Sequence, residues 1–147
     1  MNRSLVLIAA LVVAVSLLAA CGGGSAATPV PAKQTLTVDL AEWSVKASAT
    51  SVKAGTVKVT AVNKGVIPHE MHIIKTDLAA DALKLKTGEP VVDEATSGTL
   101  SGMIHEDQLA AGKTASMDFN LTPGKYVLIC NVPTHYQQGM RTVLNVE

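Results

Sequence analysis

The sequence is poor in cysteine and carries no excess of charge of either sign. Its 147 residues include two cysteines, Cys21 and Cys130, and 12 basic residues balance 12 acidic residues. The charged residues are scattered singly from Lys33 to Glu147. Neither a basic surface for nucleic acid nor an acidic tail is therefore expected, and no nucleic-acid partner is predicted.

The motifs of hydrolytic and group-transfer enzymes are also missing from the sequence. No set of nucleophile, general base and orienting acid is evident, and no glycine-rich phosphate loop is present. Glu106 and Asp107 stand beside His105 without forming a recognisable acid–base pair, and Met103 and His105 are expected to be loop residues. The sequence therefore does not predict an enzyme.

Residues 1–20 have the pattern of an export signal. A positive start at Arg3 precedes an apolar run, and Leu18-Ala19-Ala20-Cys21 resembles the lipobox of bacterial lipoproteins. That resemblance implies that Cys21 is acylated and becomes the mature N-terminus. The alternatives are an ordinary cleavage site near Cys21 or an uncleaved membrane anchor.

Residues 21–33 are rich in glycine and proline and are expected to form a linker after the lipid anchor. The predicted location is outside the cytoplasm, either on the outer face of a bacterial cytoplasmic membrane or in the periplasm. Lipidation of Cys21 leaves Cys130 without a disulfide partner in the exported domain. Coordination to a metal is one way to protect such a thiol from oxidation.

Residues 34–147 are of the size of one domain, and their pattern predicts a β-sandwich. Polar and apolar residues alternate in short runs separated by turn residues. We expect strands at residues 35–40, 43–47, 56–62, 69–75, 114–121, 125–131 and 141–146. Residues 76–101 break the pattern and are expected to form an insertion, with a short helix over residues 77–86 that begins at an Asp77 cap.

Three residues near the end of the sequence form a ligand set that suits copper. Cys130, His135 and Met140 follow one another at intervals of five residues, after an apolar strand and on the loop that leads into the last strand. One cysteine, two histidines and a weak axial methionine are the ligands of blue electron-transfer centres. Taken singly, Cys130 and Met140 would be ordinary core residues, but their joint spacing with His135 favours one copper ion of type 1.

The second histidine ligand must come from another strand, and two candidates are present. His69 and His72 point to opposite faces of the expected strand because side chains alternate. His69 follows Pro68 at the boundary between loop and strand, so we favour His69 and keep His72 as the alternative metal ligand. Trp43, Met71 and Met117 are assigned to the core.

At this point residues 34–147 resemble the cupredoxins, the group of plastocyanin, azurin, auracyanin and rusticyanin. The resemblance rests on three stretches: Val62-Asn63-Lys64-Gly65 leading to Pro68-His69-Glu70, residues 121–130, and residues 131–140. It implies a Greek-key β-sandwich in which His69, Cys130, His135 and Met140 bind copper. Glu70 departs from the pattern, because many members carry Asn or Ser after the first histidine.

The resemblance implies an electron carrier, not an enzyme, since the histidine-rich motifs of additional copper centres are absent. We expect a monomer that passes single electrons between redox partner proteins, which dock transiently near His135 over Val132, Pro133 and Tyr136. Two alternatives remain: a protein that stores or delivers Cu(I), and a metal-free accessory sandwich.

Overall fold

The computed structural model describes residues 33–147. The predicted signal peptide, Cys21 and residues 22–32 of the linker lie outside the described residues. Within residues 33–147, no helix has the length and hydropathy that crossing a membrane requires.

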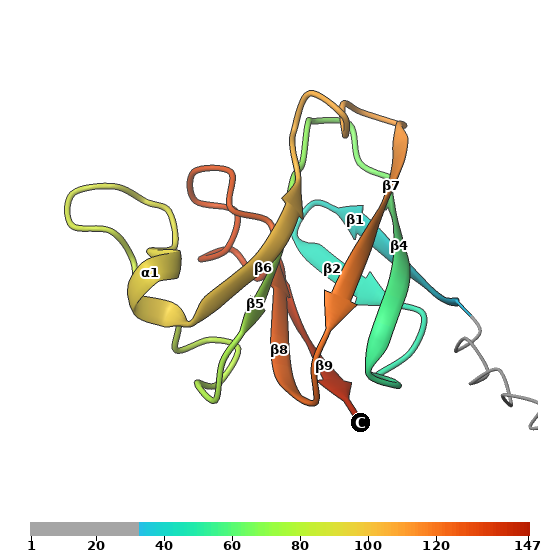
Figure 1. Cartoon of the computed structure of the whole chain (residues 1–147). Coiled ribbons are helices and arrows are strands. Elements are labelled where there is room, and N and C mark those ends of the chain that lie inside the picture. The colour runs from blue at the N-terminus through green and yellow to red at the C-terminus, as the bar shows by residue number, and fades with distance from the viewer. Residues whose placement is uncertain (1–32) are drawn as a thin grey trace, which may run out of the picture. The chain divides into compact units, whose positions relative to one another are not determined.

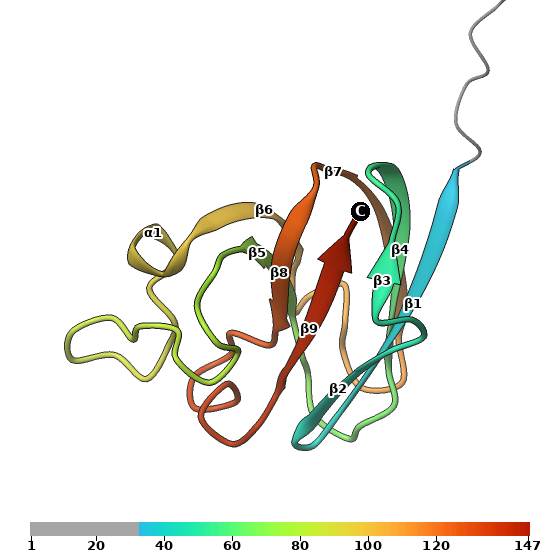
Figure 2. The same ribbon diagram turned by 90° about the horizontal axis from the view of Figure 1, so that it is seen from below.

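Two sheets pack face to face (Figures 1 and 2). One has the strand order β2-β1-β4-β7 and the other the order β3-β9-β8-β5-β6. Both sheets are mixed, because β1 pairs in parallel with β4 and β3 in parallel with β9, while the other pairs are antiparallel. The strands are β1 (Gln34–Ala41), β2 (Ser44–Ala47), β3 (Ser51–Val52), β4 (Gly55–Asn63), β5 (Met71–Lys75), β6 (Thr99–Ile104), β7 (Thr114–Leu121), β8 (Gly124–Ile129) and β9 (Arg141–Val146).

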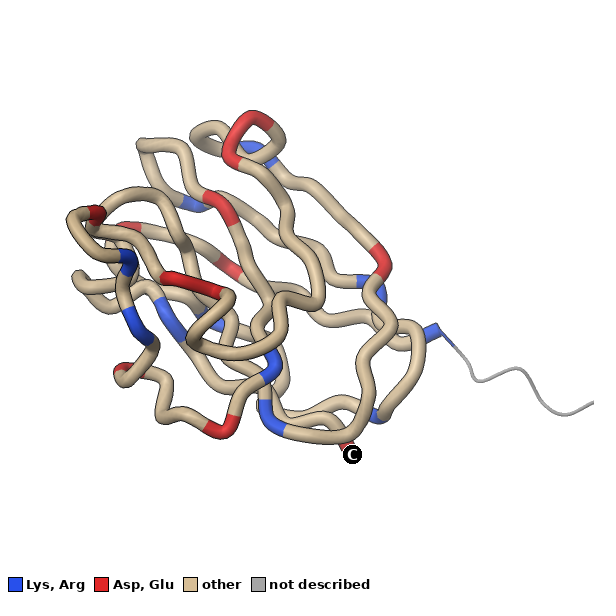
Figure 3. Tube along the Cα trace, turned by 60° about the vertical axis from the view of Figure 1, so that its left-hand side comes forward, with Lys and Arg blue, Asp and Glu red and all other residues tan. Residues whose placement is uncertain are grey.

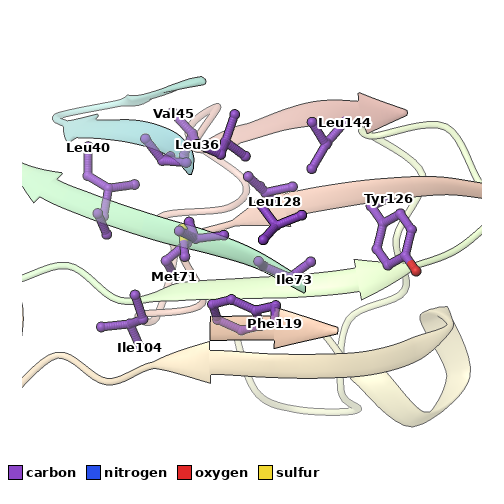
Figure 4. Packing of buried hydrophobic residues seen from close by; sticks show 14 of the residues in the cluster. Leu36, Leu40, Val45, Met71, Ile73, Ile104, Phe119, Tyr126, Leu128 and Leu144 are labelled. Atoms are coloured by element: carbon purple, nitrogen blue, oxygen red, sulfur yellow. The ribbon is translucent and has the colours of Figure 1, made fainter. Parts of the chain in front are cut away.

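The core lies between the two sheets and follows from the alternation seen in the sequence. In the centres of β1 and β4, apolar and fully buried residues alternate with more exposed ones, as in Leu36, Val38 and Leu40. These side chains meet Met71, Ile73, Leu128 and Leu144 of the opposite sheet (Figure 4). The predicted all-β Greek-key sandwich is therefore confirmed.

A second, smaller core covers the outer face of β5 and β8. Ile74, Val127 and Ile129 point away from the main core and are nevertheless fully buried, because the insertion after β5 packs over them. Leu83 and Val92 of the insertion, together with Tyr136, complete this cluster. Both strands are thus buried on both faces, which explains their nearly continuous apolar sequence.

The insertion contains a short helix, as predicted, but at a different position. Residues 77–86 form turns instead of a helix, and the only helix among the described residues is α1 (Glu94–Ser97), capped by Asp93. The Asp93 side chain accepts a hydrogen bond from the Ala95 N–H, which is the role that we had expected of Asp77. Residues 99–104 form the strand β6 and not part of the loop.

Two of the three predicted core residues are not in the core. Met71 is fully buried, as expected, but Trp43 and Met117 are each 40% exposed. Met117 lies on β7, the edge strand of its sheet, and therefore lacks a neighbouring strand on one side. Trp43 lies in the turn between β1 and β2 and packs elsewhere, as described below.

Candidate metal centre

Three of the predicted ligands converge at one end of the sandwich. The Sγ atom of Cys130 lies 3.3 Å from Nδ1 of His135 and 3.8 Å from Nδ1 of His69. The two Nδ1 atoms are 3.3 Å apart, and all three residues are buried. His69 lies just before β5 and Cys130 just after β8, and these strands are neighbours in one sheet. Sheet pairing therefore brings together residues that are distant in the sequence.

The loop from Cys130 to Met140 is closed by its own backbone. The Cys130 N–H donates to the Met140 carbonyl at 3.1 Å, and the Met140 N–H donates to the His135 carbonyl at 3.1 Å. Thr134 has a positive φ of 72°, and its N–H donates to the Pro90 carbonyl of the insertion at 2.8 Å. Met140 is fully buried in the same core cluster as Cys130. The loop thus holds His135 and Met140 in fixed positions relative to the cysteine.

The sulfur of Cys130 is shielded from water and receives backbone hydrogen bonds. Burial raises the pKa of the Cys130 thiol to about 11, although hydrogen bonds from the Glu70 and Val132 N–H groups act in the opposite direction. The Glu70 N–H lies 3.4 Å from Sγ. These donors are placed to stabilise a thiolate once a metal replaces the proton.

The two histidines are suited to bind a metal as neutral imidazoles. Burial lowers the pKa of His69 and of His135, and for His69 the nearby His135 lowers it further. Each neutral ring has one unprotonated nitrogen, and the two Nδ1 atoms face each other and the cysteine sulfur. A soft sulfur and two imidazole nitrogens fit copper, and a fully buried methionine nearby strengthens that fit.

His72, the alternative ligand, lies outside this cluster. Its ring sits on the outer side of β5 between two carboxylates: Nδ1 contacts Glu94, and Nε2 lies 3.2 Å from Glu70 without the alignment of a hydrogen bond. Burial lowers the pKa of His72, but Glu70 and Glu94 outweigh burial and raise it overall. The structure therefore brings His69, and not His72, beside Cys130 and His135.

Glu70 takes part in the site through its backbone and in a separate network through its side chain. While its N–H faces the cysteine sulfur, its carboxylate turns toward His72. Glu94 also accepts a hydrogen bond from Asn131, the residue after Cys130. The segments before β5 and after β8 are thereby connected through His72 and the insertion.

The turn between β1 and β2 covers both histidines, which the sequence did not predict. The Trp43 ring packs edge-on against His135, with 5.2 Å between ring centroids, and a Glu42 carboxylate oxygen lies 3.6 Å from Nε2 of His69. Both residues precede β2, far in sequence from the ligands. Figure 2 shows this turn at the same end of the sandwich as the loop between β8 and β9.

Tyr136, which was predicted to be part of the surface for partner docking, is buried. Tyr136 is only 4% exposed, and its hydroxyl group donates to the Ala80 carbonyl and accepts from the Leu83 N–H. Pro133 is exposed and Val132 half-buried. Tyr136 thus holds the insertion against the ligand loop and does not contribute to an exposed surface.

Comparison with known proteins identifies the family. A model of copper-binding proteins of the plastocyanin/azurin family matches residues 32–147. The chain belongs to this family, the cupredoxins. Together with the cluster of His69, Cys130 and His135, this membership supports one type 1 copper ion as the cofactor of the protein. The predicted family and cofactor are confirmed.

The cupredoxin fold recurs in solved structures. Auracyanin from Roseiflexus castenholzii is 24% identical, with a TM-score of 0.59, and the match covers 78% of this chain and 98% of that chain. Auracyanin B is 25% identical over 82% of this chain and 93% of its own, with a TM-score of 0.54. Rusticyanin from Thiobacillus ferrooxidans is 19% identical over 78% of both chains, with a TM-score of 0.53. No curated protein sequence matched the chain.

Proposed function

We propose that this cupredoxin carries single electrons between redox partner proteins outside the cytoplasm and is not an enzyme. His69, Cys130 and His135 would hold the copper ion, with Met140 as a fourth, weaker ligand. Copper held there would supply a Cu(I)/Cu(II) couple. The observation that carries the proposal is the convergence of two histidine nitrogens and a cysteine sulfur, 3.3 to 3.8 Å apart, in a buried site.

The surrounding chain is built to keep these donor atoms in place. The hydrogen bond that closes their loop holds Cys130 and Met140 together, and His69 lies just before β5, a strand that is buried on both faces. Because donor atoms fixed in this way need not move when the copper changes oxidation state, the reorganisation energy is low and electron transfer is fast. Burial of the donors also excludes water, which favours retention of copper over its delivery to another protein.

We propose that partners dock over His135, the most exposed of the three clustered residues at 6%. Trp43 packs on this ring and is 40% exposed, and Val66, in the loop before His69, is 84% exposed. Basic and acidic residues are interspersed along the described chain (Figure 3), so apolar contact is the main basis for docking. A small apolar patch suits the weak and brief contacts of an electron carrier.

The proposed location on a membrane rests on the N-terminal sequence alone. The lipobox pattern ending at Cys21 and the linker that follows support a lipid anchor on the outer face of a bacterial cytoplasmic membrane, or in the periplasm. Cys21→Ser is expected to move the protein from the membrane fraction to the soluble exported fraction. Retention of this variant in the membrane would contradict acylation at Cys21.

The decisive test of the carrier function is an optical spectrum. The chain from Ala26 onward is loaded with Cu(II), reduced and reoxidised, and an intense band in the red that disappears and returns is expected. If the protein is colourless but binds Cu(I) tightly, its function is copper storage or delivery and not electron transfer. If it binds no copper, it is a metal-free accessory β-sandwich.

A further inference from the structure

The side chain of Glu42 contacts both the proposed copper ligand His69 and the loop that precedes His69. Its Oε1 atom accepts hydrogen bonds from the Val66 N–H at 2.9 Å and the Ile67 N–H at 3.1 Å. The same atom lies 3.6 Å from Nε2 of His69. A side chain at Gly65 would collide with this carboxylate, so the glycine leaves room for it. One carboxylate oxygen therefore borders both the loop before His69 and the His69 ring.

The second nitrogen of His69 needs an acceptor. Nδ1 faces Cys130 and His135, so a ring that binds metal through Nδ1 carries its proton on Nε2. Within residues 33–147, Nε2 is buried and has no hydrogen-bond partner. A buried N–H group without an acceptor is costly, and metal-binding histidines usually donate this proton to a carboxylate or a carbonyl group.

Glu42 differs from the other carboxylates near the site. Its Oε1 atom accepts two backbone N–H groups, those of Val66 and Ile67, which is the arrangement expected of an ionised carboxylate that only accepts hydrogen bonds. Glu70 is turned toward His72, and Glu106 is exposed to solvent. Among the described residues, Glu42 alone has a carboxylate within 4 Å of a histidine of the cluster.

We propose that Glu42 is a positioning residue for the copper centre: its carboxylate accepts the Nε2 proton of His69, fixes that ring with Nδ1 toward the metal, and favours Cu(II) over Cu(I). This inference rests on the proposed function. A negative charge next to a ligand stabilises the more highly charged metal ion, so Glu42 lowers the midpoint potential. A carboxylate in this position also makes His69 a stronger donor.

The test compares Glu42→Gln with Glu106→Gln in the copper-loaded chain. Gln at position 42 keeps an oxygen that accepts from Val66 and Ile67 and removes only the charge. We expect the ratio of Cu(II) to Cu(I) affinity to fall about tenfold, within the range seen when such outer partners are changed. That factor corresponds to a midpoint potential about 59 mV higher. Glu106→Gln removes an equal charge that is exposed and makes no contact with His69, so a much smaller shift is expected.

Two results would overturn the role of Glu42. One is an unchanged midpoint potential in Glu42→Gln. The other is an equal rise of the midpoint potential in Glu42→Gln and Glu106→Gln, which would show a general effect of charge. If Glu42→Gln fails to fold, the wild-type protein loaded with Cu(I) still provides a test by nuclear magnetic resonance. The Nε2 proton of His69 is expected to be visible and to exchange slowly with water. A rapidly exchanging proton would refute the contact. A wild-type protein without the red band would instead reject the proposed function itself.

Discussion

Tyr136→Phe removes one hydroxyl group that joins the insertion to the ligand loop and leaves the aromatic ring in place. The hydroxyl donates to the Ala80 carbonyl at 2.8 Å and accepts from the Leu83 N–H at 3.0 Å. The ring belongs to the small core with Ile74, Val92 and Ile129. The substitution therefore changes polar contacts without removing apolar volume.

The expected loss of stability follows from the two backbone groups that lose their hydrogen-bond partner, the Leu83 N–H and the Ala80 carbonyl. Leu83 is 5% exposed, so its N–H cannot easily find water, whereas Ala80 is half-buried and its carbonyl can. One buried group without a partner costs about 1–3 kcal/mol. We expect a loss of about 2 kcal/mol in the free energy of unfolding, which for a domain of this size lowers Tm by roughly 8 °C.

The assay is urea unfolding of the metal-free protein combined with amide hydrogen exchange. Tyr126→Phe is the matched control, because its hydroxyl also contacts backbone groups, the N–H and carbonyl of Thr122, but lies between β7 and β8. Both variants should lose stability, and only Tyr136→Phe should speed exchange at Leu83. A loss below about 0.5 kcal/mol, or equal exchange at Leu83 in the two variants, would refute the assigned role of Tyr136.

Three further predictions concern the ligands and His72. Met140→Leu should keep copper and the red band but raise the midpoint potential in a redox titration, because an apolar side chain of similar volume replaces the thioether; an unchanged potential would place Met140 outside the centre. His69→Ala should abolish the red band and His72→Ala should retain it, and the reverse pattern would reassign the ligand. The pKa of His72 is lowered by burial but raised overall by Glu70 and Glu94. Its stabilising effect is thus fully present below the unfolded pKa of about 6.5 and is lost as pH rises through the higher folded value. In urea unfolding of the metal-free protein, the advantage of wild type over His72→Gln should be larger at about pH 6 than at about pH 9, and a constant or inverted difference would contradict this assignment.

The sequence predicted those features that depend on local pattern. The spacing of Cys130, His135 and Met140 indicated one ligand loop, and alternation separated His69 from His72. The strands 114–121 and 141–146 were predicted with their observed bounds. The strand bounds were confirmed because a strand of period two imposes its geometry on neighbouring residues, whereas the assignment of the copper ligands stays a prediction.

Features that depend on distant contacts were not predicted. Trp43 was assigned to the core as a large apolar residue, but it packs on His135, more than 90 residues later in the sequence. The role of Glu42 likewise depends on Val66 and His69, with no local signal. In the insertion, residues 77–86 have good helix formers, but hydrogen bonds and packing against β5 and β8 determine their conformation.

The conformation of the ligand loop depends on the insertion through Thr134, so the two segments have to be kept together when the protein is engineered. A β-branched residue with φ of 72° is strained, and such conformations cost on the order of 1–3 kcal/mol when nothing supports them. Support comes from the Pro90 carbonyl, which accepts the Thr134 N–H one residue before His135. If the insertion were shortened, the loop would keep its shape only with Gly or Asn at position 134. The ligand loop therefore cannot be transplanted between scaffolds as an independent cassette, because part of its conformation is encoded more than 40 residues upstream.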